Sequence, residues 1–227
     1  MTGNVVRTGS DAERRLQELG LELEYVDKAI RAGVEARASK NDFEPPSAPG
    51  LKDWIARVGK LRELVVSGAD WYYADPYNVP LVYEPTKQIA LGVLLGDRNT
   101  GRDKPKSGPR SKYPKGTMIA EATADGGDEP TLELDLTQRS RRGHLDVATL
   151  AALDVWFLVT YPAEVGDKFV VCREVSLAAP IEPDSYITSW RERLIFPPLE
   201  FGPVVMPDHP EEPDDIDVFV QARGDRT

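Results

Sequence analysis

The first pattern along the chain is a stripe of apolar residues spaced three and four positions apart. This spacing places the side chains on one face of a helix, because an α-helix turns once every ~3.6 residues. The stripe consists of Leu16, Leu19, Leu23, Val26, Ile30 and Val34. The preceding Ser10-Asp11-Ala12-Glu13 has the form of a capping box, which makes Ser10 the expected N-cap. Gly20 and Gly33 interrupt the pattern, and we expect a helix break near one of them.

A second helix is predicted after a proline-rich connection. Residues 41–50 contain Pro45, Pro46 and Pro49, which lack a backbone N–H donor and displace the preceding residue from helical geometry. Apolar residues then keep to one helical face from Leu51 to Val65. The two patterns together predict a helical hairpin over residues 1–66.

Beyond Ser67 the chain changes to short apolar or alternating runs separated by Pro, Gly and Asp, which are typical of strands and turns. The predicted strands are Leu81–Glu84, Lys87–Leu95, Thr131–Leu136, Val155–Tyr161, Lys168–Ala178, Tyr186–Phe196 and Ile216–Ala222. The Gly166-Asp167 pair between two apolar runs predicts an antiparallel hairpin. Few of these strands are separated by a helix of crossover length, which favours antiparallel pairing. The predicted fold class is therefore α+β, with an N-terminal helical hairpin packed against a mainly antiparallel β-rich body.

These patterns divide the chain into three segments. The helical hairpin covers residues 1–66, and the β-rich body covers residues 67–205 with a long loop at 97–116. Residues 206–227 form an acidic C-terminal segment, because Met206 to Asp217 contain three prolines and six acidic residues. Little structure is expected there, apart from an edge strand at its end.

Composition favours a soluble cytoplasmic protein without a membrane partner. Cys172 is the only cysteine and lies in an apolar run, where a buried structural thiol is the ordinary occupant. The longest uncharged apolar run, Ile89–Leu95, is too short to span a bilayer, and the N-terminus has no signal-peptide pattern. The 28 Lys and Arg against 38 Asp and Glu give a net charge of −10. A polyanion is therefore repelled unless the charge is segregated.

The charge is indeed segregated. Residues 97–116 carry seven cations against Asp97 and Asp103, a local charge of +5, in a stretch rich in Gly and Pro that predicts a long exposed loop. The cations are Arg98, Arg102, Lys104, Lys106, Arg110, Lys112 and Lys115. A second basic cluster comprises Arg139, Arg141 and Arg142, and Tyr113 is available to stack on a base. The pattern favours a non-catalytic binding protein, without a cofactor, that presents these cations to nucleic acid or another polyanion.

Several alternatives to this interpretation remain open. The cations of the basic loop are also explained if the loop only needs to stay solvated. They are explained equally if it contacts an acidic protein surface, or if the acidic segment of the same chain covers it. The apolar stripe from Leu16 to Val34 is equally suited to a helical partner or to self-association. Glu133 and Asp135 lie two apart on a predicted strand and so share a face, which is the arrangement of a metal-dependent hydrolase. A nucleotide-binding P-loop is excluded, because Arg102-Asp103 follow Gly101 where Lys and a hydroxyl residue are required.

Overall fold

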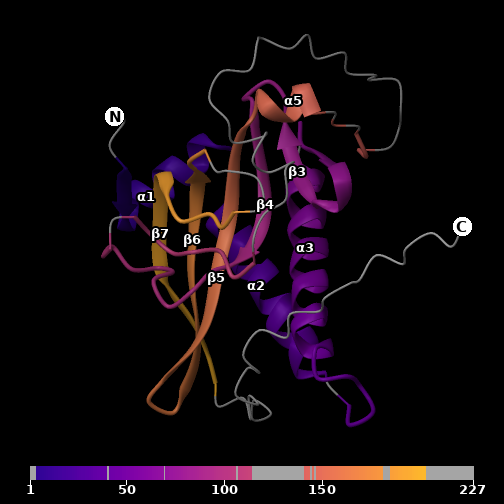
Figure 1. The fold of residues 1–227 in the computed structure, drawn as a ribbon, viewed down its shortest axis with the longest axis vertical. Coiled ribbons are helices and arrows are strands. Elements are labelled where there is room, and N and C mark those ends of the chain that lie inside the picture. The colour runs from indigo at the N-terminus through magenta and orange to yellow at the C-terminus, as the bar shows by residue number, and fades with distance from the viewer. Residues whose placement is uncertain are drawn as a thin grey trace, which may run out of the picture.

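The computed structural model describes residues 4–39, 41–68, 70–105, 107–113, 141–143, 145, 147–180 and 185–202. Its helices and strands follow one another along the chain as shown in Figure 1. They are β1 (Val5–Thr8), α1 (Gly9–Glu18), α2 (Leu23–Ala38), α3 (Ala48–Gly68), β2 (Tyr72–Ala74), a 3-10 turn (Pro76–Asn78), β3 (Leu81–Glu84), β4 (Ile89–Leu95), α5 (Val147–Ala151), β5 (Asp154–Val165), β6 (Lys168–Ala178) and β7 (Trp190–Phe201). None of the helices in the described ranges is long and apolar enough to cross a membrane.

The strands form one seven-stranded mixed sheet in the order β1-β7-β6-β5-β4-β3-β2. β1 and β7 are parallel, as are β4 and β5, and the other neighbouring pairs are antiparallel. The predicted α+β class with a mainly antiparallel sheet is therefore confirmed. The predicted hairpin is present as well: Val165 pairs with Lys168, and Gly166 has a positive φ of 66° that a two-residue turn requires.

Helices α1, α2 and α3 cover one face of the sheet (Figure 1) and share a single apolar core with it. The predicted apolar stripe supplies much of the helical side of this core. Its members Leu16, Leu19, Val26, Ile30 and Val34 are at most 5% exposed, and Leu23 is partly buried against them. The helices and the sheet therefore stabilise one another by burying the same apolar surface.

Two buried charged contacts join these helices to the sheet. Arg57 of α3 donates hydrogen bonds to Asp53 of the same helix and to Thr160 of β5. Arg173 of β6 donates to Asp27 of α2. Because both arginines are almost fully buried, each requires its acidic partner to offset the loss of solvation.

The expected helix break occurs at Gly20. The Gly20 N–H donates to the Gln17 carbonyl at 2.8 Å and the Leu21 N–H to the Leu16 carbonyl at 3.1 Å, which is a Schellman C-cap. Gly20 has a φ of 83°, the left-handed conformation that this cap needs. Gly33 is different, because it lies inside α2 where a Cβ would come within 2.3 Å of the Asp53 carboxylate. It is there for close helix packing and does not break the helix.

The expected N-cap at Ser10 is wrong. Helix α1 begins at Gly9 with Thr8 as its N-cap, and the Thr8 side chain makes no capping hydrogen bond. Thr8 is extended because it still pairs with Ile195 of β7, so the end of β1 decides where the helix begins. Strand β1 was not predicted: three of its four residues are β-branched, but four residues are too few to show an alternating pattern.

Every predicted strand that is described belongs to the sheet, although several bounds differ: β5 runs to Val165 instead of Tyr161, and β2 was not predicted. Strands β3 and β6 have the predicted bounds, whereas β4 begins at Ile89 because Pro85 to Gln88 form a turn. Strand β7 begins at Trp190 instead of Tyr186, because Ile187 is hydrogen-bonded to Ser111 of the basic loop, and it ends at Phe201 instead of Phe196. The expected strands at 131–136 and 216–222, and the acidic segment 206–227, lie outside the described residues.

Candidate functional site

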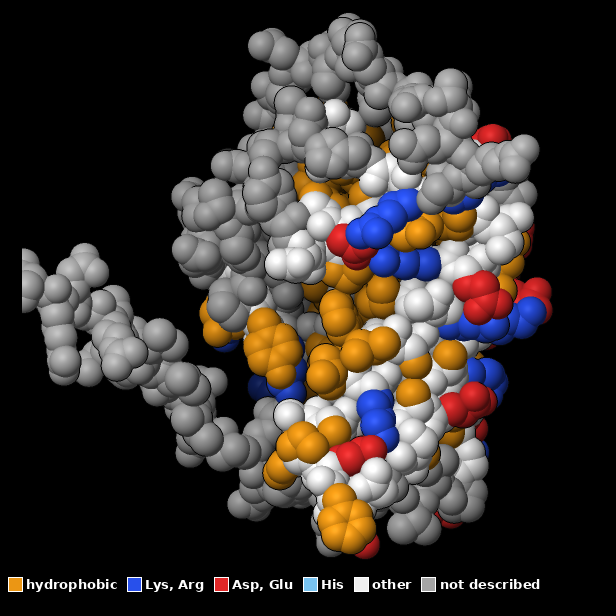
Figure 2. Space-filling model, turned by 90° about the vertical axis from the view of Figure 1, so that its right-hand side faces the viewer, with side chains coloured by type: hydrophobic (Ala, Val, Ile, Leu, Met, Phe, Trp, Pro, Cys, Tyr) orange, Lys and Arg blue, Asp and Glu red, His pale blue; other side chains and the backbone are white. Residues whose placement is uncertain are grey.

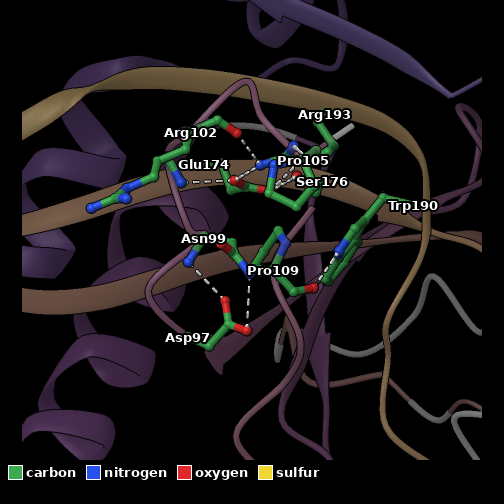
Figure 3. Close-up of polar contacts among 10 residues, drawn as sticks. Asp97, Asn99, Arg102, Pro105, Pro109, Glu174, Ser176, Trp190 and Arg193 are labelled. Atoms are coloured by element: carbon green, nitrogen blue, oxygen red, sulfur yellow. Dashed lines mark hydrogen bonds and ion pairs between the residues drawn. The ribbon is translucent and has the colours of Figure 1, made fainter. Parts of the chain in front are cut away.

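The basic loop, residues 97–116, is described at 97–105 and 107–113 and lies on the face of the sheet opposite the helices. It begins with an Asx turn, in which Asp97 Oδ1 accepts the Asn99 N–H at 2.9 Å (Figure 3). The Thr100 N–H donates to the Asp97 carbonyl at 2.9 Å and closes the turn. The chain then crosses over β6 and β7, where two polar side chains lie beneath it.

These side chains are Glu174 of β6 and Arg193 of β7, and both are 0% exposed. Arg193 binds the carboxylate through two hydrogen bonds, from Nε to Oε1 at 2.9 Å and from Nη2 to Oε2 at 2.5 Å. Ser176 Oγ donates to the same Oε1 at 2.7 Å. A bidentate pair of this kind has a defined geometry, and it presents its remaining donors and acceptors in fixed directions.

The buried pair holds the loop backbone (Figure 3). Glu174 Oε2 accepts the Gly101 N–H at 2.9 Å, while Arg193 donates to the Arg102 carbonyl at 2.9 Å and to the Pro105 carbonyl at 3.2 Å. The backbone also approaches the sheet closely at Gly108, where a Cβ would lie 2.6 Å from Trp190 Cδ1. The loop is therefore anchored to the sheet along its inner side.

A second set of hydrogen bonds fixes the loop backbone on both sides of Arg110. Trp190 Nε1 donates to the Pro109 carbonyl at 2.9 Å (Figure 3). The Ser111 N–H donates to the Ile187 carbonyl at 2.9 Å, and the Ile187 N–H donates back to Ser111 Oγ at 3.1 Å. The Lys112 N–H donates to the Leu95 carbonyl at 2.9 Å, which returns the loop to the end of β4.

The prediction of an exposed loop is correct for the cations and wrong for the backbone beneath them. Thr100, Gly108 and Ser111 are buried, because the loop serves as the cover of this sheet face. The described cations all lie on the exposed side, and they are Arg98, Arg102, Lys104, Arg110 and Lys112. Lys106 and Lys115 lie outside the described residues.

The loop cations also differ from cations elsewhere in their ion pairing. On the helices, Arg14 pairs with Asp11, Lys28 with Glu24 and Lys60 with Glu63. Within the described ranges, by contrast, Arg98, Arg102, Lys104 and Arg110 form no ion pair. Figure 2 shows the side of the molecule that carries α3, where basic and acidic side chains are interspersed around apolar ones. The basic loop is thus a local excess of positive charge.

Two aromatic rings accompany the loop cations. The Arg110 guanidinium carbon lies 3.6 Å from the centroid of the Tyr186 ring. Lys112 Nζ lies 5.7 Å from the centroid of the Tyr113 ring, and Tyr113 is 57% exposed, as a stacking residue must be. The sequence predicted Tyr186 only as the start of a strand and not as a site residue, because only the folded chain brings it beside Arg110.

The second basic cluster lies elsewhere on the sheet. The Arg141 carbonyl accepts the Tyr73 N–H at 2.9 Å and the Gly143 N–H donates to the Tyr73 carbonyl at 2.9 Å, which places residues 141–143 beside the edge strand β2. Arg141 lies over the Tyr72 ring and Arg142 is 3.8 Å from Asp75. Since the basic loop is anchored to β6 and β7, the two clusters belong to different parts of the sheet. Arg139 lies outside the described residues.

The other predicted sites are placed as follows. The helical stripe is buried in the chain's own core, so its side chains contact the sheet. Glu133 and Asp135 lie outside the described residues, and in the described ranges no group of three or more His, Cys, Asp or Glu is arranged to hold a metal ion. Cys172 is half-buried on β6, and burial raises the pKa of its thiol, although the nearby Arg102 opposes part of that rise.

Glu174 and Arg193 are the site residues that the sequence pattern did not predict. The available signal was a pair of polar residues, Glu174 and Ser176, which lie two apart on one face of a mostly apolar strand. Comparison of the chain with protein-family models, curated proteins and solved structures found no match.

Proposed function

We propose that this protein is a non-catalytic binding protein that holds a polyanion on the exposed cations of the basic loop. The observation that carries the proposal is the contrast between the two sides of the loop. Its inner side is fixed by the buried Glu174–Arg193 pair, and its outer side displays four exposed cations that form no ion pair within the described ranges. They are Arg98, Arg102, Lys104 and Arg110. A loop ordered before binding loses less conformational entropy on binding, which favours affinity.

Electrostatics supports the same assignment. The chain has a net charge of −10, so most of its surface repels a polyanion and the basic loop is the place where one is attracted. Lys and Arg contacts to phosphates carry no sequence information, and their strength depends on salt. We also assign the protein to the cytoplasm, because a single half-buried thiol without a disulfide partner suits a reducing compartment.

The test compares two charge-reversed proteins. In the loop variant Arg98, Arg102 and Lys104 are changed to Glu, and in the control variant Arg14, Lys28 and Lys60 are changed to Glu. Both variants change the net charge by the same amount, and the control cations lie on the helical face. Affinity for a single-stranded oligonucleotide and for inorganic polyphosphate is measured across a salt series.

We expect the wild-type affinity to fall steeply with salt. The loop variant should bind at least about tenfold more weakly, and its log–log salt slope should be smaller by about 0.7 for each phosphate that it no longer neutralises. The control variant should remain within about threefold of wild type, because paired surface charges contribute little. Equal weakening in both variants, or no binding by the wild type at low salt, contradicts the proposal.

A further inference from the structure

The closest contact between a cation and an aromatic ring in the described chain is the one between Arg110 and Tyr186. The guanidinium carbon lies 3.6 Å from the ring centroid, whereas the other such distances range from 5.2 to 5.8 Å. A separation near 3.6 Å is van der Waals contact, so the guanidinium rests on the ring. Arg110 is exposed and Tyr186 is half-buried. The ring therefore supports the guanidinium from beneath.

The backbone on both sides of this contact is fixed. Pro109 is held by the Trp190 indole, and Ser111 exchanges two hydrogen bonds with Ile187, the residue that follows Tyr186. Ser111 is 1% exposed, which shields these hydrogen bonds from water. The same contacts that anchor the loop therefore bring Arg110 and Tyr186 together, and the stack is built into the fold.

A guanidinium stacked on a ring can bind a flat ligand, whereas attraction of an anion needs only the positive charge. Nucleic-acid bases stack on guanidinium planes and on aromatic rings, and every base offers a π-face. The bases of a duplex already stack on one another, whereas those of a single strand are free to turn outward. Tyr113, three residues further along the loop and largely exposed, provides a second ring for a neighbouring base.

We propose that the basic loop binds single-stranded nucleic acid, with one base stacked on Arg110 where it rests on Tyr186 and the backbone phosphates on the neighbouring cations. This inference rests on the proposed function and adds the ligand class to it. A purely anionic ligand, such as polyphosphate or an acidic peptide, has no base to stack. Lysine at position 110 would therefore bind such a ligand as well as arginine does.

The experiment measures the affinity of the full chain for three probes by fluorescence anisotropy at one salt concentration. They are an oligothymidylate, an abasic strand with the same number of phosphates, and a duplex of the same length. The wild type should bind oligothymidylate about fivefold or more tightly than the abasic strand, because stacking stabilises each bound base by at least ~1 kcal/mol. The duplex should bind more weakly than oligothymidylate, because its bases are already stacked on one another.

Conservative variants separate stacking from charge. Arg110→Lys keeps the positive charge and removes the guanidinium plane, so it should abolish the preference for oligothymidylate while its affinity for the abasic strand stays within about twofold. Arg98→Lys is the matched control, because Arg98 lies on no aromatic ring in the described chain, and it should keep the preference. Thermal unfolding of each variant verifies that the fold is retained.

The outcomes distinguish this inference from the function on which it rests. Equal binding of oligothymidylate and the abasic strand, or the same loss of preference in both lysine variants, overturns the stacking site and leaves salt-dependent polyanion binding intact. Tighter binding of the duplex than of oligothymidylate also overturns the stacking site. If no probe binds at low salt, both the stacking site and the proposed function are wrong.

Discussion

Arg193 engages all three nitrogens of its guanidinium group, although it is fully buried. Nε and Nη2 bind Glu174, Nη2 also binds the Arg102 carbonyl, and Nη1 binds the Pro105 carbonyl. Removing a buried charge's partner is strongly destabilising, because the remaining charge cannot regain its solvation. At the residue scale, this one side chain therefore links the stability of the sheet to the order of the basic loop.

We expect Arg193→Met to destabilise the protein by roughly 3–5 kcal/mol, since it leaves the Glu174 carboxylate buried without a counter-charge. Chemical denaturation measures the destabilisation. The loop should also become more accessible to trypsin after Arg102, because the Arg102 carbonyl then has no donor to hold it. The double variant with Glu174→Met should recover part of the stability. A single variant that unfolds like wild type would show that the pair does not anchor the loop.

Cys172 offers a second residue-scale prediction, concerning pH. Burial raises the pKa of its thiol, so less of the reactive thiolate is present at a given pH than for a free cysteine. The pH midpoint of its alkylation should therefore lie above that of a free thiol. Arg102 lowers this pKa, so Arg102→Ala should move the midpoint higher still. A midpoint unchanged by this variant would contradict the proximity of the two side chains.

The linkage to stability follows from the direction of that shift. A thiol whose pKa is raised by folding holds its proton more tightly in the folded state, so its contribution is fully present below the pKa of the unfolded thiol. That contribution is lost as the pH rises through the folded pKa. Tyr83 behaves in the same way, because burial raises its pKa as well. Stability should therefore decline on the alkaline side, and Cys172→Ala should reduce the decline.

At the scale of elements, Gly33 and Gly59, which both lie in the middle of a helix, have opposite roles. Gly33 in α2 faces α3 so closely that a Cβ would lie 2.3 Å from Asp53 Oδ1 and 3.0 Å from the Asp53 carbonyl oxygen. Gly59 in α3 is exposed and a Cβ there would meet nothing within 4 Å. Only position 33 requires glycine for packing, although glycine destabilises the helix relative to alanine by the same amount at both positions.

Alanine at each position tests this difference. Gly59→Ala should stabilise the protein by about 1 kcal/mol, because alanine favours the helix and no contact opposes it. Gly33→Ala gains the same propensity but must displace the buried Asp53–Arg57 pair, so we expect a net destabilisation of about 1–3 kcal/mol. Urea unfolding of the two variants compares them directly. Equal stabilisation by both would show that α2 and α3 do not pack at Gly33.

Elements also differ in how well their sequence predicts them. Strands β3 and β6 have the predicted bounds, because turns rich in Gly, Pro and Asp delimit them. The break between α1 and α2 follows from Gly20, which the C-cap requires in a left-handed conformation. Strand β1 has similar flanking residues, but it is only four residues long, and its place beside β7 pairs residues nearly the whole length of the described chain apart.

At the scale of the whole molecule, the basic loop is part of the connection between β4 and β5. These strands are parallel, and a parallel pair needs a crossover that returns the chain to the same end of the sheet. Here the connection includes the basic loop and α5. The basic loop does not itself make that return, because Lys112 bonds back to Leu95 at the end of β4. It is an excursion of the connection over β6 and β7 that covers a face of the sheet which would otherwise be exposed.

The sequence predicted the charges of the candidate site, but it did not predict the contacts that anchor the loop to the sheet. The local excess of Lys and Arg in the loop, and the exposed Tyr113, are properties of a continuous stretch of chain. The anchors join residues far apart: Gly101 lies 73 positions from Glu174, and Arg102 lies 91 positions from Arg193. The separation of Arg141 and Arg142 from the loop likewise depends on strand order, which no local pattern contains.

The sequence alone determined the N-terminal helices, most of the strands, the α+β class and the position of the positive charge, because periodicity, turn residues and charge act between near neighbours in the chain. Only the tertiary structure decided the two parallel strand pairs, the start of α1, the burial of the helical stripe and the stack of Arg110 on Tyr186. These features depend on which distant segments meet, and that outcome is set by the burial of apolar surface and the pairing of buried polar groups over the whole molecule.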